Sequence, residues 1–125
     1  MWTYTVKTGV LQDRNSKFVS LGYSGGGGGT VPEAVNNPDY QHVKDVGPLP
    51  NGMYDIGEPE QHPRLGAYAI PLTPYPDNEM YGRGGFFIHG DNQHMNQSAS
   101  DGCIILPYSV RVVLGAGTDK LLQVV

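Results

Sequence analysis

The chain has 125 residues, of which 38% are hydrophobic and 16% charged, and its formal net charge is −4. This length favours a single domain, residues 1–125, with a core that needs neither metal nor disulfide. The acidic balance and the lack of a basic cluster argue against nucleic acid or an anionic membrane surface as a partner. No segment approaches the roughly 18 apolar residues of a membrane span.

The N-terminal third predicts short strands followed by a loop. Residues Trp2–Val6 alternate aromatic and β-branched residues with polar ones, as a strand does. Lys17–Tyr23 predicts a second strand, in a hairpin or meander with the first. The glycine run Ser24–Thr30 predicts a flexible loop or a close backbone approach. It lacks the Gly-Lys-Ser/Thr ending of a phosphate-binding P-loop. Pro32–Val43 has room for one helical turn.

The rest of the chain predicts more strands and one helix. A proline and Asn-Gly turn leads into a strand around Met53–Ile56. Further strands are predicted over Gly66–Leu72, Gly84–Gly90 and Asp119–Val125. Leu106–Gly117 has the apolar spacing and the terminal glycine of a short helix. The predicted fold class is therefore mostly β, a β-rich α+β domain with one short helix.

The chain's only cysteine, Cys103, stands fourteen positions after His89. A lone cysteine is usually a buried and inert residue. Here His89 ends one apolar run and Cys103 begins the next, so the two side chains can meet if those strands are neighbours. An imidazole that takes the proton of a thiol creates the nucleophile of acyl transfer. The pattern therefore indicates a catalytic Cys–His pair.

The residues just before the cysteine suit that chemistry. Gly102 allows a close backbone approach, and the amides of Gly102 and Cys103 can face a developing oxyanion. The Ser100 hydroxyl can brace the turn. The polar segment 91–100 can arch over the site as a loop.

The other histidines give weaker signals. His94, in the polar loop, is interpreted as a surface or supporting group, whereas His42 and His62 are expected to be solvated. A zinc site would need His89, His94 and Cys103, but zinc usually takes three or four ligands at short paired spacings. We therefore expect no metal.

The motifs "IHG" and "SDGCII" resemble the L,D-transpeptidase (YkuD-like) family, whose signature is His-Gly followed by Ser/Thr-x-Gly-Cys. "VGPLPNGMYDI" resembles that family's Pro-x-Gly turn before a strand. "YSGGGGG…NNP" and "GRGGFFIHGDN" point more closely to a small branch that includes antibacterial effectors of type VI secretion systems. The resemblance covers about residues 23–106. It implies an L,D-transpeptidase-like β-sandwich or barrel with a short helix after the cysteine.

The resemblance also implies roles. Cys103 resembles the nucleophile that attacks an amide carbonyl of the peptidoglycan stem tetrapeptide. His89 resembles the base, and then the acid that protonates the leaving amine. Gly102 and Cys103 amides would form the oxyanion hole, and Ser100 would support the loop. The family needs no cofactor. An amine acceptor from another stem gives a cross-link, a free D-amino acid gives exchange, and water gives an L,D-carboxypeptidase.

The sequence departs from the family pattern in two places. The common motif continues Cys-x-Arg, but here Ile105 stands two residues after the cysteine, and Asp101 stands where histidine is frequent. Arg83 is the expected replacement for the arginine, with Arg111 a weaker one. The alternative for Arg83 is a surface side chain that packs on Tyr81 or Phe86. The positions expected to contact substrate are Arg83, Gly90, Asp101 and Tyr81.

Two alternative functions for the same sequence are a non-catalytic module and a different class of cysteine protease. The missing arginine favours a catalytically silent cell-wall-binding or phage structural module of the same fold. A papain-like endopeptidase is disfavoured, because its histidine follows its cysteine. The N-terminus has no apolar run of a secretory signal peptide. We therefore expect synthesis in the cytoplasm and action in the periplasm after injection or phage release. A toxin of this kind would have a cognate immunity protein as partner.

Overall fold

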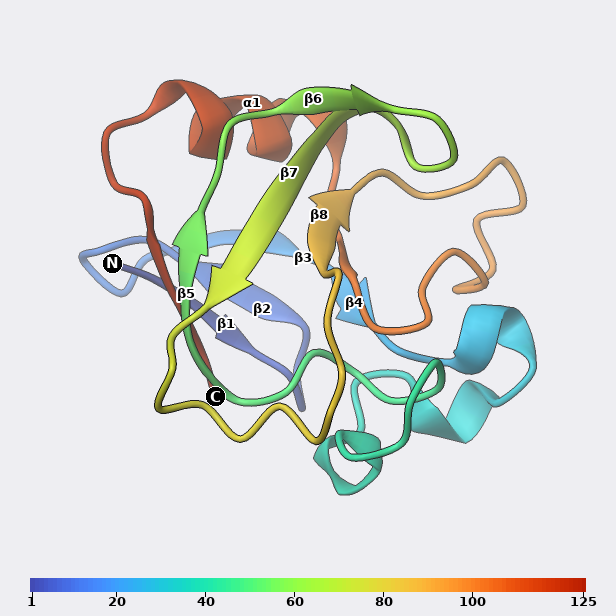
Figure 1. The fold of residues 1–125 in the computed structure, drawn as a ribbon. Coiled ribbons are helices and arrows are strands. Elements are labelled where there is room, and N and C mark those ends of the chain that lie inside the picture. Colours follow the sequence, from blue (N-terminus) through green and yellow to red (C-terminus); the bar gives the residue numbers. More distant parts are fainter.

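Ten short strands and one α-helix make up the computed structural model of residues 1–125 (Figure 1). The strands are β1 (Trp2–Thr5), β2 (Val10–Gln12), β3 (Phe18–Leu21), β4 (Tyr23–Ser24), β5 (Gly52–Ile56), β6 (Glu60–His62), β7 (Gly66–Pro74), β8 (Phe87–His89), β9 (Ile104–Ile105) and β10 (Leu121–Val124). The helix α1 spans Tyr108–Ala116, and three 3-10 turns cover η1 (Gly27–Gly29), η2 (Pro32–Ala34) and η3 (Pro38–Tyr40).

The strands form one mixed sheet that curls back on itself. Their order is β3-β2-β1-β10-β5-β7-β8-β9-β4, and β6 pairs with β7 outside this path. The first and last strands of the order, β3 and β4, are consecutive in the chain and separated only by Gly22. Two pairs are parallel, β1 with β10 and β8 with β9, and the others are antiparallel. The mostly-β class with one short helix after Cys103 is confirmed.

Most predicted elements occur in the structure, with differences in the shortest ones. The predicted strand Lys17–Tyr23 is divided into β3 and β4, and the unpredicted β2 lies between β1 and β3, which makes a meander. Strand β6 was not predicted, because its polar residues show no strand alternation, and β9, which has two residues, was not delimited. Strands this short are defined by their partners, because two or three residues carry too little periodicity.

Fifteen buried side chains form one core, including Tyr4, Tyr54, Ile70 and Ile88. Helix α1 contacts β7 and lies along one end of the sheet in Figure 1, and its buried Leu114 joins the core. None of the helices combines the length and apolar content needed to cross a membrane.

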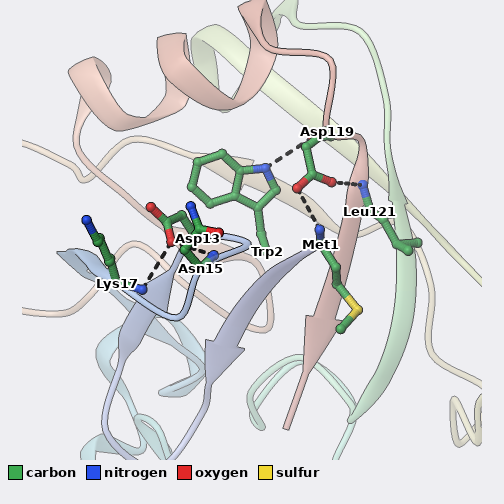
Figure 2. Close-up of polar contacts among 7 residues, drawn as sticks. All are labelled: Met1, Trp2, Asp13, Asn15, Lys17, Asp119 and Leu121. Atoms are coloured by element: carbon green, nitrogen blue, oxygen red, sulfur yellow. Dashed lines mark hydrogen bonds and ion pairs between the residues drawn. The ribbon is translucent and has the colours of Figure 1, made fainter.

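The N-terminal strand is tied to the C-terminal one by Asp119 (Figure 2). Its carboxylate is 2.6 Å from the amino group of Met1 and accepts the amide of Leu121, while its carbonyl accepts Trp2 Nε1. These contacts lie just before β10 and fix the parallel β1–β10 pair.

A second tie shapes the turn between β2 and β3, where Asp13 Oδ1 accepts the amides of Asn15 and Lys17 (Figure 2). An aspartate that accepts amides two and four residues ahead stabilises a tight turn.

Candidate active site

His89 and Cys103 lie on two neighbouring parallel strands, at opposite ends of their short ladder. His89 is the last residue of β8, and Cys103 directly precedes β9. In the parallel ladder Ile88 pairs with Ile104, so Cys103 lies level with Phe87, two residues before His89. That diagonal corresponds to about 8 Å between Cα atoms, from a strand rise of ~3.3 Å and a strand spacing of ~4.8 Å. The two strands are neighbours as the prediction requires, but their parallel direction places the two residues diagonally across the pair and not side by side.

The imidazole of His89 is held in one tautomer. Its Nδ1 is 2.9 Å from the carbonyl oxygen of Gly90. A carbonyl can only accept, so Nδ1 carries the proton and Nε2 presents its lone pair. The side chain is 4% exposed, and this burial lowers the pKa of His89, with a further contribution from the charge of Arg111. At neutral pH His89 is therefore a neutral base.

The thiol of Cys103 is also buried and neutral at rest. The residue is 7% exposed, and the amide of Phe87 donates a 3.3 Å hydrogen bond to Sγ. Burial raises the pKa of the Cys103 thiol to about 11, although the Phe87 hydrogen bond acts in the opposite direction. The charge of Asp101 raises the pKa of both Cys103 and His89, which places both groups within electrostatic range of that carboxylate.

Ser100 is fully buried and joins three backbone groups. Its hydroxyl donates to the carbonyl of Cys103 at 2.6 Å and accepts the amides of Gly25 and Gly102 at 2.9 and 3.1 Å. The hydroxyl therefore fixes the turn that carries the cysteine. Because the Gly102 amide donates to Ser100, the Cys103 amide is left as the candidate oxyanion donor of the two.

Gly102 occupies a position that a side chain would not fit. Its φ is +151°, and a Cβ there would lie 2.6 Å from the ring of Phe86 and 2.7 Å from Nη2 of Arg83. The glycine lets the backbone pass close to both side chains before it reaches Cys103.

A second buried serine, Ser24, was missed by the sequence analysis. Its hydroxyl donates to the carbonyl of Gly102 and accepts the amide of Leu49. The sequence feature that could have indicated Ser24 is its position at the start of the glycine run. The backbone of this run lies next to the loop that carries Cys103, since the amide of Gly28 donates to the carbonyl of Ser100. The close-approach interpretation of the glycine run is therefore correct.

Tyr23 ties down the polar loop that follows His89. Its hydroxyl donates to Asp91 at 2.7 Å and accepts the amide of Ala99 at 3.1 Å. The hydroxyl therefore links the two ends of segment 91–99. In Figure 1 this loop extends away from the sheet, on the same side as the 3-10 turns η1 and η2.

Arg83 is a buried anchor with its guanidinium occupied by the backbone. Its Nη atoms donate to four carbonyls, those of Gln41, Gly47, Pro48 and Asp101, at 2.6 to 3.3 Å. It also lies over the ring of Phe86, 5.2 Å from the centroid. The surface alternative for Arg83 is therefore wrong, because the side chain is 7% exposed.

Arg111 lies next to Gly90, the residue whose carbonyl orients His89. Its guanidinium donates to the carbonyls of Leu106, Ala67 and Tyr68. A Cβ on Gly90 would lie 2.7 Å from Nη2 of Arg111. Gly90 thus accepts the hydrogen bond of His89 on one side and makes room for Arg111 on the other.

The remaining predicted residues lie near the surface. Asp101 is exposed and lines a hollow of ≈ 60 Å³ with Cys103, Arg83 and five others, whereas Tyr81 is 42% exposed and outside it. His94 and His42 are exposed as expected.

The expectation that His62 is solvated is wrong. It ends β6, is half-buried, and meets the ring of Phe87 edge-on at 5.0 Å. The aromatic contact comes from a strand pairing that its polar sequence does not show.

Residues 20–114 match the family model described as the Tlde1 domain. A search of curated proteins found no match to this chain. The matched segment includes β8, β9, the Ser100 turn and α1 as far as Leu114, so it holds the whole of the Cys–His arrangement. The chain therefore belongs to the Tlde1 domain family of L,D-transpeptidase-like, peptidoglycan-targeting effectors of type VI secretion systems.

Proposed function

We propose that this domain is a cysteine acyl-transferase or peptidase that acts on peptidoglycan stem tetrapeptides, with Cys103 as nucleophile and His89 as base. The observation that carries the proposal is the His89 tautomer: Nδ1 is bonded to Gly90, and Nε2 is left free on the strand beside the chain's only thiol. Family membership supports the substrate.

The reaction proceeds through a thioester. Nε2 of His89 takes the thiol proton as Sγ attacks the amide carbonyl, and the Cys103 amide faces the resulting oxyanion. The C–N bond then breaks, and the imidazolium gives its proton to the leaving amine. Water releases the acyl group as an acid, while the amine of a D-amino acid replaces the lost residue. Hydrolysis and exchange thus share one acyl-enzyme.

The Gly90 carbonyl takes the place of the carboxylate that orients the histidine in many catalytic triads. It fixes the tautomer, but it adds no negative charge to stabilise an imidazolium. Together with the raised pKa of Cys103 and the lowered pKa of His89, this favours proton transfer at the moment of attack over a resting thiolate–imidazolium pair.

Arg83 supports this site as a positioning residue. Its bonds join the segment 41–48 to Asp101, one residue before Gly102. Because the four carbonyls occupy its Nη atoms, a substrate carboxylate would have to displace backbone partners. Asp101 and Tyr81 remain candidates for substrate contact from their exposed positions.

A catalytically silent module is the second candidate, and one observation favours it. Sγ of Cys103 accepts a backbone amide and is nearly inaccessible, as in an inert buried cysteine. The segments that cover the thiol would have to open for substrate.

Membership of the family supports delivery of this domain into a target cell. An effector of type VI secretion reaches the periplasm of the target cell, where peptidoglycan lies. A cognate immunity protein would protect the producing cell by covering the hollows beside Cys103 and His89.

Mass spectrometry of muropeptide tetrapeptides tests the proposal. Purified protein is incubated with the tetrapeptide, with and without a free D-amino acid, and Cys103→Ala serves as the blank. Loss of the terminal D-alanine that depends on Cys103 supports the enzyme, and its replacement by the added amino acid identifies exchange. Unchanged tetrapeptide in both incubations favours the silent module.

A further inference from the structure

The thiol and the base face two different hollows. Cys103 lines the hollow of ≈ 60 Å³ described above. His89 lines a larger one, of ≈ 280 Å³, formed by the tip of the β6–β7 hairpin and the loop after β8. The residues around the larger hollow are Arg64, Leu65, His89, Gly90, Asp91, Asn92 and Ala99.

Arg64 is the one cation in the larger hollow, and its guanidinium has no partner. The side chain is exposed, makes no hydrogen bond, and takes no part in the single ion pair of the structure, which joins Met1 and Asp119. Arg83 and Arg111, by contrast, are buried and occupied by backbone carbonyls. Of the three arginines around the site, only Arg64 is free to bind an anion.

The hairpin that carries Arg64 is held in a defined shape. Nδ1 of His62 accepts the amides of Arg64 and Leu65, both at 3.1 Å. The His62 ring in turn packs on Phe87 of β8. Strand pairing of His62 with Gly66 closes the hairpin. The backbone of Arg64 is therefore fixed relative to the strand that ends in His89.

The chemistry of the proposed reaction determines what lies beside His89. The imidazolium protonates the leaving amine, so the leaving amino acid must sit on the His89 side of the scissile bond. A residue released from the C-terminus of a stem peptide carries a free α-carboxylate. A guanidinium binds a carboxylate with two parallel hydrogen bonds.

We propose that Arg64 binds the α-carboxylate of the terminal residue that is released, and of the free amino acid that replaces it in exchange. The inference rests on the proposed function and deepens it, because it makes the domain specific for the free C-terminal end of a stem peptide. Position 105, two residues after the cysteine, is a buried isoleucine and supplies no cation. The charge of Arg64 also lowers the pKa of the Cys103 thiol, which agrees with its lying near the pair.

Binding to a variant that cannot turn over tests Arg64 directly. The tetrapeptide with a free C-terminal carboxylate and the same tetrapeptide with a C-terminal amide are titrated calorimetrically into Cys103→Ala. We expect the free acid to bind at least about 10-fold more tightly than the amide, as a charge-assisted bidentate pair allows. Adding Arg64→Gln should remove this preference by weakening the acid alone, and Arg64→Lys should restore part of it.

Arg14→Gln is the matched control, because Arg14 is an exposed arginine of the β2–β3 turn and lines none of the three hollows. It should keep the acid preference. Equal binding of acid and amide to Cys103→Ala, or a preference that survives Arg64→Gln, overturns the assignment.

Turnover by the unmodified protein is measured separately. Absence of turnover with an Arg64-dependent acid preference would overturn the proposed catalysis and leave the carboxylate site standing.

Discussion

The amide of Phe87 donates a hydrogen bond to Sγ of Cys103, across the pair of parallel strands that also carries His89. This bond places the thiol against the backbone of β8 and out of water. It also means that the nucleophile begins as a buried thiol, so reactivity toward a small alkylating reagent does not measure catalytic competence.

Alkylation of Cys103 should be slow in the folded protein. A rise of the thiol pKa from 9.0 to about 11 lowers the thiolate fraction at neutral pH by about 100-fold. Iodoacetamide labelling followed by mass spectrometry measures the rate on this single-cysteine chain. The same protein in guanidinium should label at the rate of free cysteine. Labelling of the folded protein faster than free cysteine would contradict a raised pKa.

Ser100→Ala should destabilise the protein by at least about 2 kcal/mol, because two amides and one carbonyl lose a buried partner and each such loss costs about 1–3 kcal/mol. Urea denaturation followed by circular dichroism measures the change. Ser98→Ala is the control, because Ser98 is half-buried and accepts only the side chain of Asn92. Its change should stay within about 0.5 kcal/mol. Equal effects would show that Ser100 does not fix the turn.

Gly90→Ala should be destabilising by about 1–3 kcal/mol, as expected for overpacking. The added Cβ would lie 2.7 Å from Nη2 of Arg111, which three carbonyls hold in place. A double-mutant cycle with Arg111→Lys isolates this contact. The cost of Gly90→Ala should be smaller in the Arg111→Lys background, because the shorter group leaves space. Strictly additive costs would mean that the two residues do not compete for that space.

The stability of the protein should fall in mild acid through His89. Burial lowers the pKa of His89 below 6.5, so between these two values the unfolded chain binds more protons than the folded one. The free energy of unfolding therefore decreases as the pH falls below 6.5 and levels off below the folded pKa. His89→Gln should flatten this dependence in urea titrations between pH ~5 and ~7.5. His94→Gln, at an exposed histidine, should keep the slope of the unmodified protein.

Local patterns in the sequence determined the class of the fold and the identity of the candidate pair. Strand alternation in β1 and the apolar runs of β5, β7 and β8 were visible because side chains on a strand alternate between two environments. The spacing of apolar residues and the terminal glycine likewise predicted α1. Cys103 and His89 stood out because a single thiol after a glycine, and a histidine at the end of an apolar run, are local features.

Only the tertiary structure decided how the site is assembled. The bond between Ser100 and Gly25, the four bonds of Arg83 and the contact of Arg111 with Gly90 join segments far apart in the chain. No local pattern encodes which distant carbonyl a serine or guanidinium will meet, because that depends on the sheet order. The same reason hid Arg64: its place beside His89 follows from β6 pairing with β7 and from the packing of His62 on Phe87, contacts that only the folded chain brings together.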